Sequence, residues 1–252
     1  MVTGAPRGQT AADVQQALAE VADADDAVFL QRFFKTGPGE YGEGDVFIGV
    51  RVPQTRAVAK RFPGLTLDEV ERLLASEVHE HRLAGLIILV SRFGRASAAS
   101  TRDDDARAEI ADFYLTAVRA GRVNNWDLVD ASAEYILGEY LHDRPRDILH
   151  EFAESPVLWE RRVAVLSTFG FIKHGDASTT LELAERLLAD PEDLMHKAVG
   201  WMLREVGKRV DRGLLLGFLD EHAARMPRTT LSYATEHLDA EARARYRSVP
   251  RR

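Results

Sequence analysis

The sequence predicts an all-α protein. Apolar residues recur with a period near 3.6 rather than 2 in the segments 67–76, 81–93, 148–155, 162–173, 180–190 and 194–208. Thr66 and Glu69 form a capping-box pattern at the start of one segment. Prolines that suit a helix start stand at Pro145, Pro191 and Pro227. The run nearest to a β-strand, 46–52, is isolated and ends at Pro53.

The expected helices also repeat along the chain. Similar blocks begin at residues 81, 126, 161 and 196, with spacings of 45, 35 and 35 residues. A period of this length built from two helices is typical of HEAT-like arrays, although a helical bundle can show such similarity by chance. We therefore predict a right-handed α-solenoid of HEAT-like helical repeats with a concave groove. No change of composition marks a boundary, so residues 1–252 are expected to form a single domain, with residues 1–10 flexible.

Composition narrows the function classes. The chain has no cysteine, which excludes a disulfide scaffold, a thiolate zinc site and a cysteine nucleophile. Its net charge is −7, but residues 201–252 carry 11 basic and 7 acidic residues, which suits either a basic binding face or a solvated surface. There is no apolar run of roughly 20 residues and no apolar core of a signal peptide, so we expect a cytoplasmic protein without a membrane partner.

One segment interrupts the helical pattern. Residues 33–53 carry five glycines but match neither phosphate-binding fingerprint. We expect a loop that joins two helices. Its glycines, Lys35 and its aromatic residues would also suit a flexible rim over a ligand.

The segment NNWDLVD (124–130) is the strongest candidate for chemistry. Asn124 or Asn125 can cap a helix, and Trp126 and Asp130 are then i, i+4 neighbours on one face. In the repeat alignment, Asp130 takes the place of small or apolar residues at Gly85, Val165 and Gly200. A carboxylate at such a position needs a partner or a role. It could pair with an arginine, cap a helix or face a ligand.

Residues of the next two repeats could complete a site. If the repeats stack in register, Arg162 and Trp201 join Trp126 and Asp130 on one concave surface, where tryptophan faces and a carboxylate suit a cationic or sugar-like ligand. Taken singly, each tryptophan is more often a core residue than a site residue. Nearby basic residues that could bind phosphates or form surface ion pairs are Arg56, Arg82, Lys173, Arg204, Lys208, Arg209 and Arg228. The histidines lie apart in the sequence and predict no metal site.

A series of segments runs in order from Phe33 to Tyr233: FFKTGPGEYGEGDVFIGVRVPQTR, HEHRLAGLIILV, NNWDLVD, SPVLWERRVAVLSTFGFI, EDLMHKAVGWMLREVGK and MPRTTLSYA. Together they resemble the AlkD-like DNA alkylation repair family, which are bacterial DNA glycosylases built from HEAT-like repeats. The resemblance implies a concave, basic groove for duplex DNA and excision of N3- or N7-alkylated purines. A solenoid whose groove does this work can function as a monomer. The resemblance implies no cofactor, no metal and no obligate protein partner.

The resemblance also assigns roles to residues. The catalytic aspartate corresponds to Asp130, and the other site residues correspond to Trp126, Trp201 and Arg162. Residues that contact the DNA backbone correspond to Arg56, Arg204 and Lys208. Phe33 stands where one branch of the family has a tyrosine, so this chain lacks that hydroxyl. The alternatives are a non-catalytic HEAT-like protein that binds damaged or branched DNA, and a HEAT-type protein scaffold.

Overall fold

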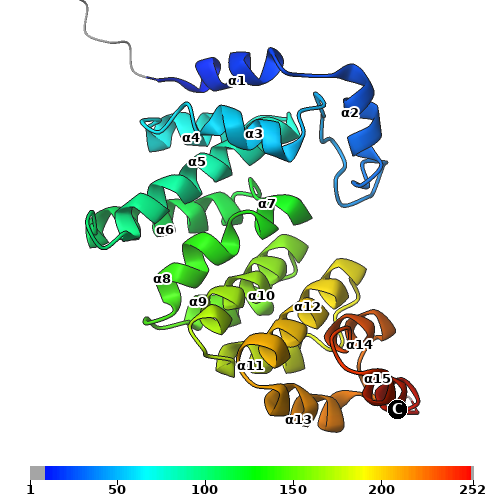
Figure 1. The fold of residues 1–252 in the computed structure, drawn as a ribbon. Coiled ribbons are helices and arrows are strands. Elements are labelled where there is room, and N and C mark those ends of the chain that lie inside the picture. The colour runs from blue at the N-terminus through cyan, green and yellow to red at the C-terminus, as the bar shows by residue number, and fades with distance from the viewer. Residues whose placement is uncertain (1–8, 251–252) are drawn as a thin grey trace, which may run out of the picture. The chain divides into compact units, whose positions relative to one another are not determined.

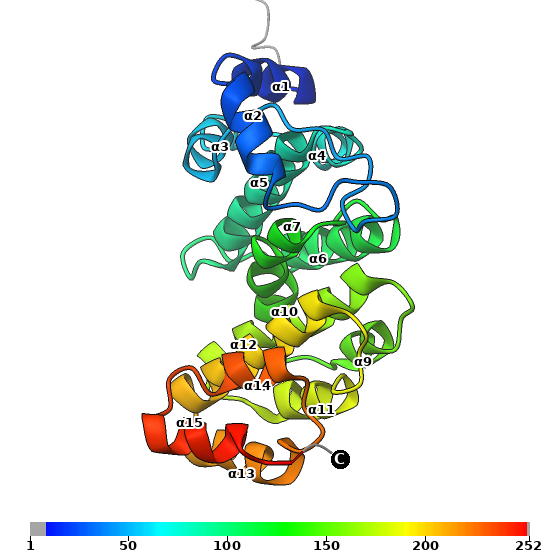
Figure 2. The same cartoon turned by 90° about the vertical axis from the view of Figure 1, so that its right-hand side faces the viewer.

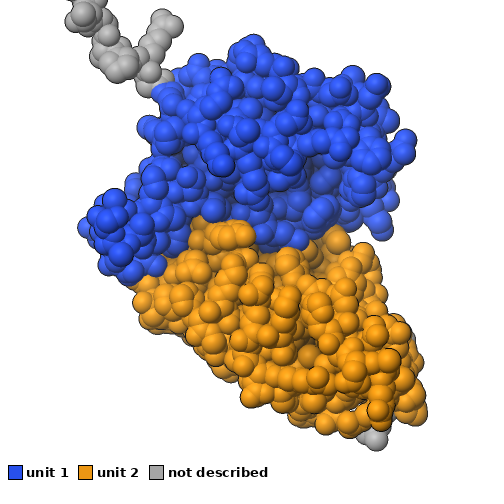
Figure 3. Space-filling model, viewed as in Figure 1, with its two compact units in different colours: residues 1–132 blue, residues 133–252 orange. Residues whose placement is uncertain are grey.

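The computed structural model describes residues 9–250, and helices make up their regular structure (Figure 1). The chain divides into two compact units, residues 1–132 and residues 133–252 (Figure 3). The expected flexibility of residues 1–10 concerns mainly residues that lie outside the described range. Within that range no helix is long and apolar enough to cross a membrane. The single domain stays a prediction.

The first unit is assembled around a long central helix, α5. Its helices are α1 (Ala11–Ala19), α2 (Ala24–Gln31), α3 (Val52–Ala59), α4 (Leu67–Leu74), α5 (His79–Ser97), α6 (Asp104–Arg119) and α7 (Trp126–Asp130). Helix α5 packs against α1, α3, α4, α6 and α7 (Figure 2). Leu86 and Leu89 of α5 are completely buried. Removal of this apolar surface from water is the main stabilisation of the unit.

The second unit has two central helices, α10 and α12. Its elements are the π-helix η1 (Glu134–Gly138), α8 (Glu139–Leu141), α9 (Asp147–Ala153), α10 (Leu158–Lys173), α11 (Ser178–Arg186), α12 (Asp193–Arg209), α13 (Arg212–His222), α14 (Arg228–Ala234) and α15 (Ala240–Arg247). Helix α10 packs against η1, α9, α11 and α12, and α12 packs against α13 and α14. Successive helices thus pack as pairs, and the predicted all-α helical-repeat class is confirmed.

Only one of the two hydrogen bonds of the predicted capping box forms at α4. Thr66 caps the helix, because its side chain accepts a hydrogen bond from the backbone N–H of Glu69 at 3.4 Å. The Glu69 carboxylate does not return the bond; its Oε2 accepts from the backbone N–H of Ala11 at 2.7 Å instead. A complete capping box forms at α1, between Thr10 and Asp13. The Glu69 side chain therefore joins α1 to α4 rather than closing its own helix.

The β-like run 46–52 forms no strand within residues 9–250. It contributes one isolated parallel bridge, between Val46 and Val78, and ends in the first residue of α3. The glycine-rich segment connects α2 to α3, as expected of a loop between two helices.

Candidate active site

A pocket of about 330 Å³ in the first unit collects half of the predicted site residues. Its lining residues are Leu30, Phe33, Phe34, Val52, Arg56, Leu83, Trp126, Asp127, Asp130 and Ala131. They come from α2 and the residues after it, from α3, from α5 and from α7. Four of the predicted site residues are among them: Phe33, Arg56, Trp126 and Asp130. An apolar wall with two carboxylates and one guanidinium suits a ligand that is both flat and positively charged.

Helix α7 positions Trp126 and Asp130. Asn125, not Asn124, is its N-cap, and the Asn125 side-chain oxygen accepts a hydrogen bond from the Trp126 N–H at 2.8 Å. The Trp126 ring stacks on Phe34, with centroids 5.3 Å apart and planes at 15°. Asp130 lies one turn after Trp126 and lines the same pocket, so the predicted i, i+4 neighbourhood is confirmed.

The surroundings of Asp130 differ from those of its counterparts in the repeat alignment. A Cβ atom on Gly85 would lie 3.2 Å from Leu73, and one on Gly200 would lie 2.6 Å from the Thr230 carbonyl oxygen. Those glycines allow close helix crossings. Asp130, by contrast, is half-exposed and lines the pocket.

The Asp130 carboxylate also influences a buried phenol. Burial raises the pKa of Tyr114, and the negative charge of Asp130 adds to this effect. The Tyr114 hydroxyl is 2.8 Å from the Ser132 hydroxyl, which donates to the Leu128 carbonyl at 2.6 Å. Tyr114 is therefore neutral at physiological pH and packs α6 against the end of α7.

Beneath the pocket lies a buried imidazole between two carboxylates. His79 is 2% exposed; its Nε2 is 2.8 Å from Asp127 Oδ2, and its Nδ1 is 3.2 Å from Asp45 Oδ2. Both ring nitrogens must donate, because ionised carboxylates only accept. Burial lowers the pKa of His79, but the charges and hydrogen bonds of Asp127 and Asp45 outweigh it and raise the pKa to about 9. His79 is thus an imidazolium that fixes Asp127 in the pocket wall.

The same group of charges holds the glycine-rich loop. Asp45 also accepts hydrogen bonds from Arg82 Nη2 at 2.5 Å and from Asn125 Nδ2 at 2.9 Å. Burial raises the pKa of Asp45, but its bond to His79, the Arg82 charge and the Asn125 amide together hold it below its usual value. Arg82 is only 4% exposed and is paired with Asp45, so of the two alternatives, a phosphate contact and an ion pair, the ion pair describes it. Its charge balances a buried carboxylate.

The end of the loop is fixed by Glu80. Its carboxylate accepts hydrogen bonds from the backbone N–H groups of Ile48, Gly49 and Val50, with distances from 2.9 to 3.2 Å. Gly49 has a φ of +80°, and a Cβ there would lie 1.8 Å from the Asp23 carbonyl oxygen, so only glycine fits. These contacts hold the end of the glycine-rich loop in place, so the alternative of a flexible rim does not describe this part of the loop.

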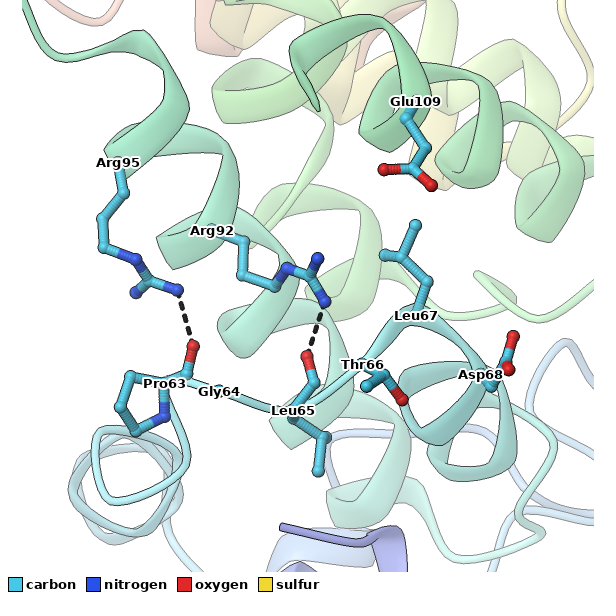
Figure 4. A pocket seen from close by; sticks show the side chains of 9 residues that line it. All are labelled: Pro63, Gly64, Leu65, Thr66, Leu67, Asp68, Arg92, Arg95 and Glu109. Carbon is cyan, nitrogen blue, oxygen red and sulfur yellow. Dashed lines mark hydrogen bonds between the residues drawn. The ribbon is translucent and has the colours of Figure 1, made fainter. Parts of the chain in front are cut away.

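A second hollow of the first unit serves a structural purpose (Figure 4). It lies between the loop after α3 and helix α5, and its two guanidiniums point at backbone carbonyls. Arg92 donates to the Leu65 oxygen at 2.5 Å, and Arg95 donates to the Pro63 oxygen at 2.7 Å. Both arginines hold the loop in place, and the negative charge of Glu109 in the same hollow would repel an anionic ligand.

The predicted site residues of the second unit lie on α10 and α12. Arg162 is 4% exposed and donates to the Leu194 carbonyl oxygen at 2.7 Å, which ties α10 to the start of α12. Trp201 is half-buried and packs edge-to-face on Phe169, with centroids 5.9 Å apart. The meeting of Arg162 and Trp201 with Asp130 stays a prediction.

The two predicted phosphate contacts on α12 differ in their partners. Arg204 forms ion pairs with Glu205, at 3.0 Å, and with Glu236. The alternative of an ion pair therefore describes Arg204, although its partner Glu205 is buried rather than at the surface. Lys208, one turn further, is exposed and has no ion pair within residues 9–250.

Sequence reasoning missed Phe34, Asp127 and His79. A signal for His79 was present: the run HEHR places charged residues at the start of a long apolar helix, where burial demands partners. The partners themselves, Asp45 and Asp127, carry no local pattern that identifies them.

Two kinds of comparison with known proteins found a match. The family model of the DNA alkylation repair enzymes matches residues 14–238. A solved structure described as a predicted DNA alkylation repair enzyme from Enterococcus faecalis is similar in fold, with a TM-score of 0.67 and 16% identity over 87% of this chain and 97% of that chain. No curated protein sequence matches significantly. The match over most of the chain shows that the protein belongs to the family of DNA alkylation repair enzymes.

Proposed function

We propose that the protein is a DNA glycosylase that excises positively charged N3- or N7-alkylated purines from duplex DNA by hydrolysing the N-glycosidic bond. The observation that carries this proposal is the position of Asp130, which lines one pocket together with the stacked rings of Trp126 and Phe34. Family membership supports a role in DNA repair and contact with DNA.

The chemistry requires one carboxylate. Alkylation at N3 or N7 places a positive charge on the purine, so the base leaves without a general acid, unlike the leaving group of ordinary glycoside hydrolysis. Positive charge then grows on the deoxyribose. Asp130 stabilises this oxocarbenium-like sugar and positions the attacking water, and the Trp126 face attracts the cation. A pocket that is open to solvent tolerates adducts larger than methyl.

DNA contact is assigned to basic residues next to the pocket and on α12. Arg56 lines the pocket, is exposed, and forms no ion pair within the described range of the chain. A guanidinium in this state can bind a phosphate without losing another partner. Lys208 is equally available, whereas Arg204 must exchange Glu236 for a phosphate. Phe33, 58% exposed, offers an aromatic face to the sugar or base. The resemblance of the sequence to the family also assigns roles in the reaction to Trp201 and Arg162, which belong to the second unit.

The test is release of the base from methylated duplex DNA. The wild-type protein should release 7-methylguanine or 3-methyladenine without added metal and leave an abasic site, detected by mass spectrometry. Asp130→Asn should slow release by about 10²–10³-fold or more, because it removes the charge that stabilises the transition state, and should leave DNA affinity nearly unchanged. Asp112→Asn, at an exposed aspartate of the same unit, is the matched control.

Each contrary outcome has a definite meaning. Full activity of Asp130→Asn removes this carboxylate from the mechanism. A wild-type protein that binds DNA and releases no base is a non-catalytic DNA-binding protein of damaged or branched DNA. Both DNA-binding functions predict affinity that falls steeply with salt, so only the excision assay separates them. Absence of DNA affinity at low salt indicates a protein scaffold.

A further inference from the structure

A pair of glycines brings two elements of the second unit into close contact. A Cβ on Gly170 would lie 2.6 Å from the Gly138 carbonyl carbon, and a Cβ on Gly138 would lie 2.5 Å from the Ser167 carbonyl oxygen. Any side chain at either position would separate η1 from α10. Since the backbones touch here, the residues that follow Gly138 meet those that follow Gly170.

The residues that meet are Glu139, His142 and His174. The imidazole rings of His142 and His174 stack with centroids 4.0 Å apart and planes at 12°. His174 Nε2 is 3.1 Å from Glu139 Oε2. One potential ligand atom from each residue lies within 4.8 Å of the other two. The two histidines lie 32 residues apart in the sequence, so only the fold brings them together.

Hydrogen bonding prepares one of these imidazoles as a ligand. His142 Nδ1 is 3.2 Å from the backbone carbonyl oxygen of Glu139. A carbonyl oxygen only accepts, so Nδ1 carries the proton and Nε2 keeps its lone pair. Metal-binding histidines commonly donate their second N–H to a carbonyl in this way.

We propose that Glu139, His142 and His174 bind one divalent transition-metal ion of the zinc type. Two imidazole nitrogens and one carboxylate oxygen suit Zn²⁺, Co²⁺ or Ni²⁺, whereas Mg²⁺ and Ca²⁺ prefer oxygen ligands alone. Three protein ligands leave a coordination position for water. A rotation of the exposed His174 ring directs its Nε2 at the ion, and the proton between Nε2 and Glu139 passes to solvent.

The bound ion would stabilise the folded chain. The ligands come from α8 and its C-terminal end and from the C-terminal end of α10, so an ion bound only by the folded chain shifts the folding equilibrium towards the native state. With the ion at about 100 times its dissociation constant, the melting temperature should rise by about 5–10 °C. This proposal is independent of the glycosylase activity, which involves no residue of the cluster.

The experiment titrates the full chain with Zn²⁺ alone after treatment with a chelator, using calorimetry, and with Co²⁺ using its visible absorption. We expect one ion per chain. His142→Ala and His174→Ala should each weaken binding at least about tenfold and abolish the rise in melting temperature. Glu139→Gln, which keeps the shape of the side chain, should weaken binding as well.

A matched control is available in the same unit. His150 Nε2 lies 3.6 Å from Glu182, a histidine–carboxylate pair without a second histidine, so His150→Ala should leave the stoichiometry and affinity unchanged. Circular dichroism of each variant reports whether the helices are retained. The proposal is wrong if the wild-type chain binds no ion stoichiometrically, or if folded His142→Ala and His174→Ala bind as tightly as the wild type.

Discussion

The buried His79 predicts a loss of stability at alkaline pH. Its pKa is about 9 in the folded chain, against 6.5 for an unperturbed histidine, because the attraction of Asp45 and Asp127 exceeds the opposing effects of burial and of the Arg82 charge. The folded state therefore binds this proton more tightly than the unfolded state. The difference is worth about 3 kcal/mol, present in full below pH 6.5 and lost as the pH rises through 9.

Chemical denaturation at a series of pH values between 6 and 10 measures this loss. The free energy of unfolding of the wild type should fall by about 3 kcal/mol across the range, beyond what other groups contribute. His79→Gln removes the titrating group, so this variant should be less stable at pH 6 by about 3–5 kcal/mol and should lack the corresponding fall.

Nuclear magnetic resonance of the His79 ring gives an independent reading. Its protons should titrate near pH 9, while those of His81, whose pKa burial and the Arg82 charge lower, should titrate below the usual range. Titration of His79 near 6.5, or an equal alkaline loss in wild type and His79→Gln, would refute the account of a charge held between two carboxylates.

Three further predictions concern stability and DNA contact. Glu80→Gln should destabilise the protein by about 1.5–3 kcal/mol in urea denaturation, because the loop N–H groups lose an ionised acceptor; an unchanged midpoint would contradict this. Gly170→Ala should cost about 1–3 kcal/mol, whereas Gly94→Ala, a helical glycine with no neighbour within 4 Å, should stabilise by about 0.5–1 kcal/mol; equal melting temperatures would contradict the close crossing. Arg56→Ala should lower the slope of log affinity against log salt by about 0.9, and an unchanged slope excludes a phosphate contact.

Local patterns in the sequence predict the helices and one part of the site. The 3.6-residue period locates the core-facing helices because each must bury an apolar face, and Thr66 and Asn125 mark helix starts through their own side chains. The same reasoning predicts that Trp126 and Asp130 are neighbours, because side chains four positions apart on a helix lie on the same face. Contacts of this kind depend only on neighbouring positions.

Contacts between distant residues escape such reasoning. The partners of His79 lie 34 and 48 residues away, at Asp45 and Asp127, and nothing near either aspartate in the sequence distinguishes it from a solvated one. At Glu69 the local pattern predicts a contact that does not form. The pattern predicts a capping box with Thr66, whereas the Glu69 carboxylate accepts a hydrogen bond from the backbone N–H of Ala11. A buried charged group without a partner costs free energy, so a contact supplied by the tertiary fold can replace the contact that the local sequence predicts.

The two kinds of contact meet in the pocket wall. Asp127 stands between Trp126 and the rest of α7, and its bond to the His79 imidazolium joins that helix to Asp45 and so to the glycine-rich loop. The loop in turn carries Phe34, against which Trp126 stacks. Asp45 does not line the pocket. A substitution there would nevertheless weaken the positions of both Asp127 and the loop that carries Phe34. We expect a substitution of Asp45 to lower the proposed base excision, measured as release of the methylated purine, with little effect on the affinity for undamaged DNA, because it disturbs the pocket and leaves the exposed basic residues in place.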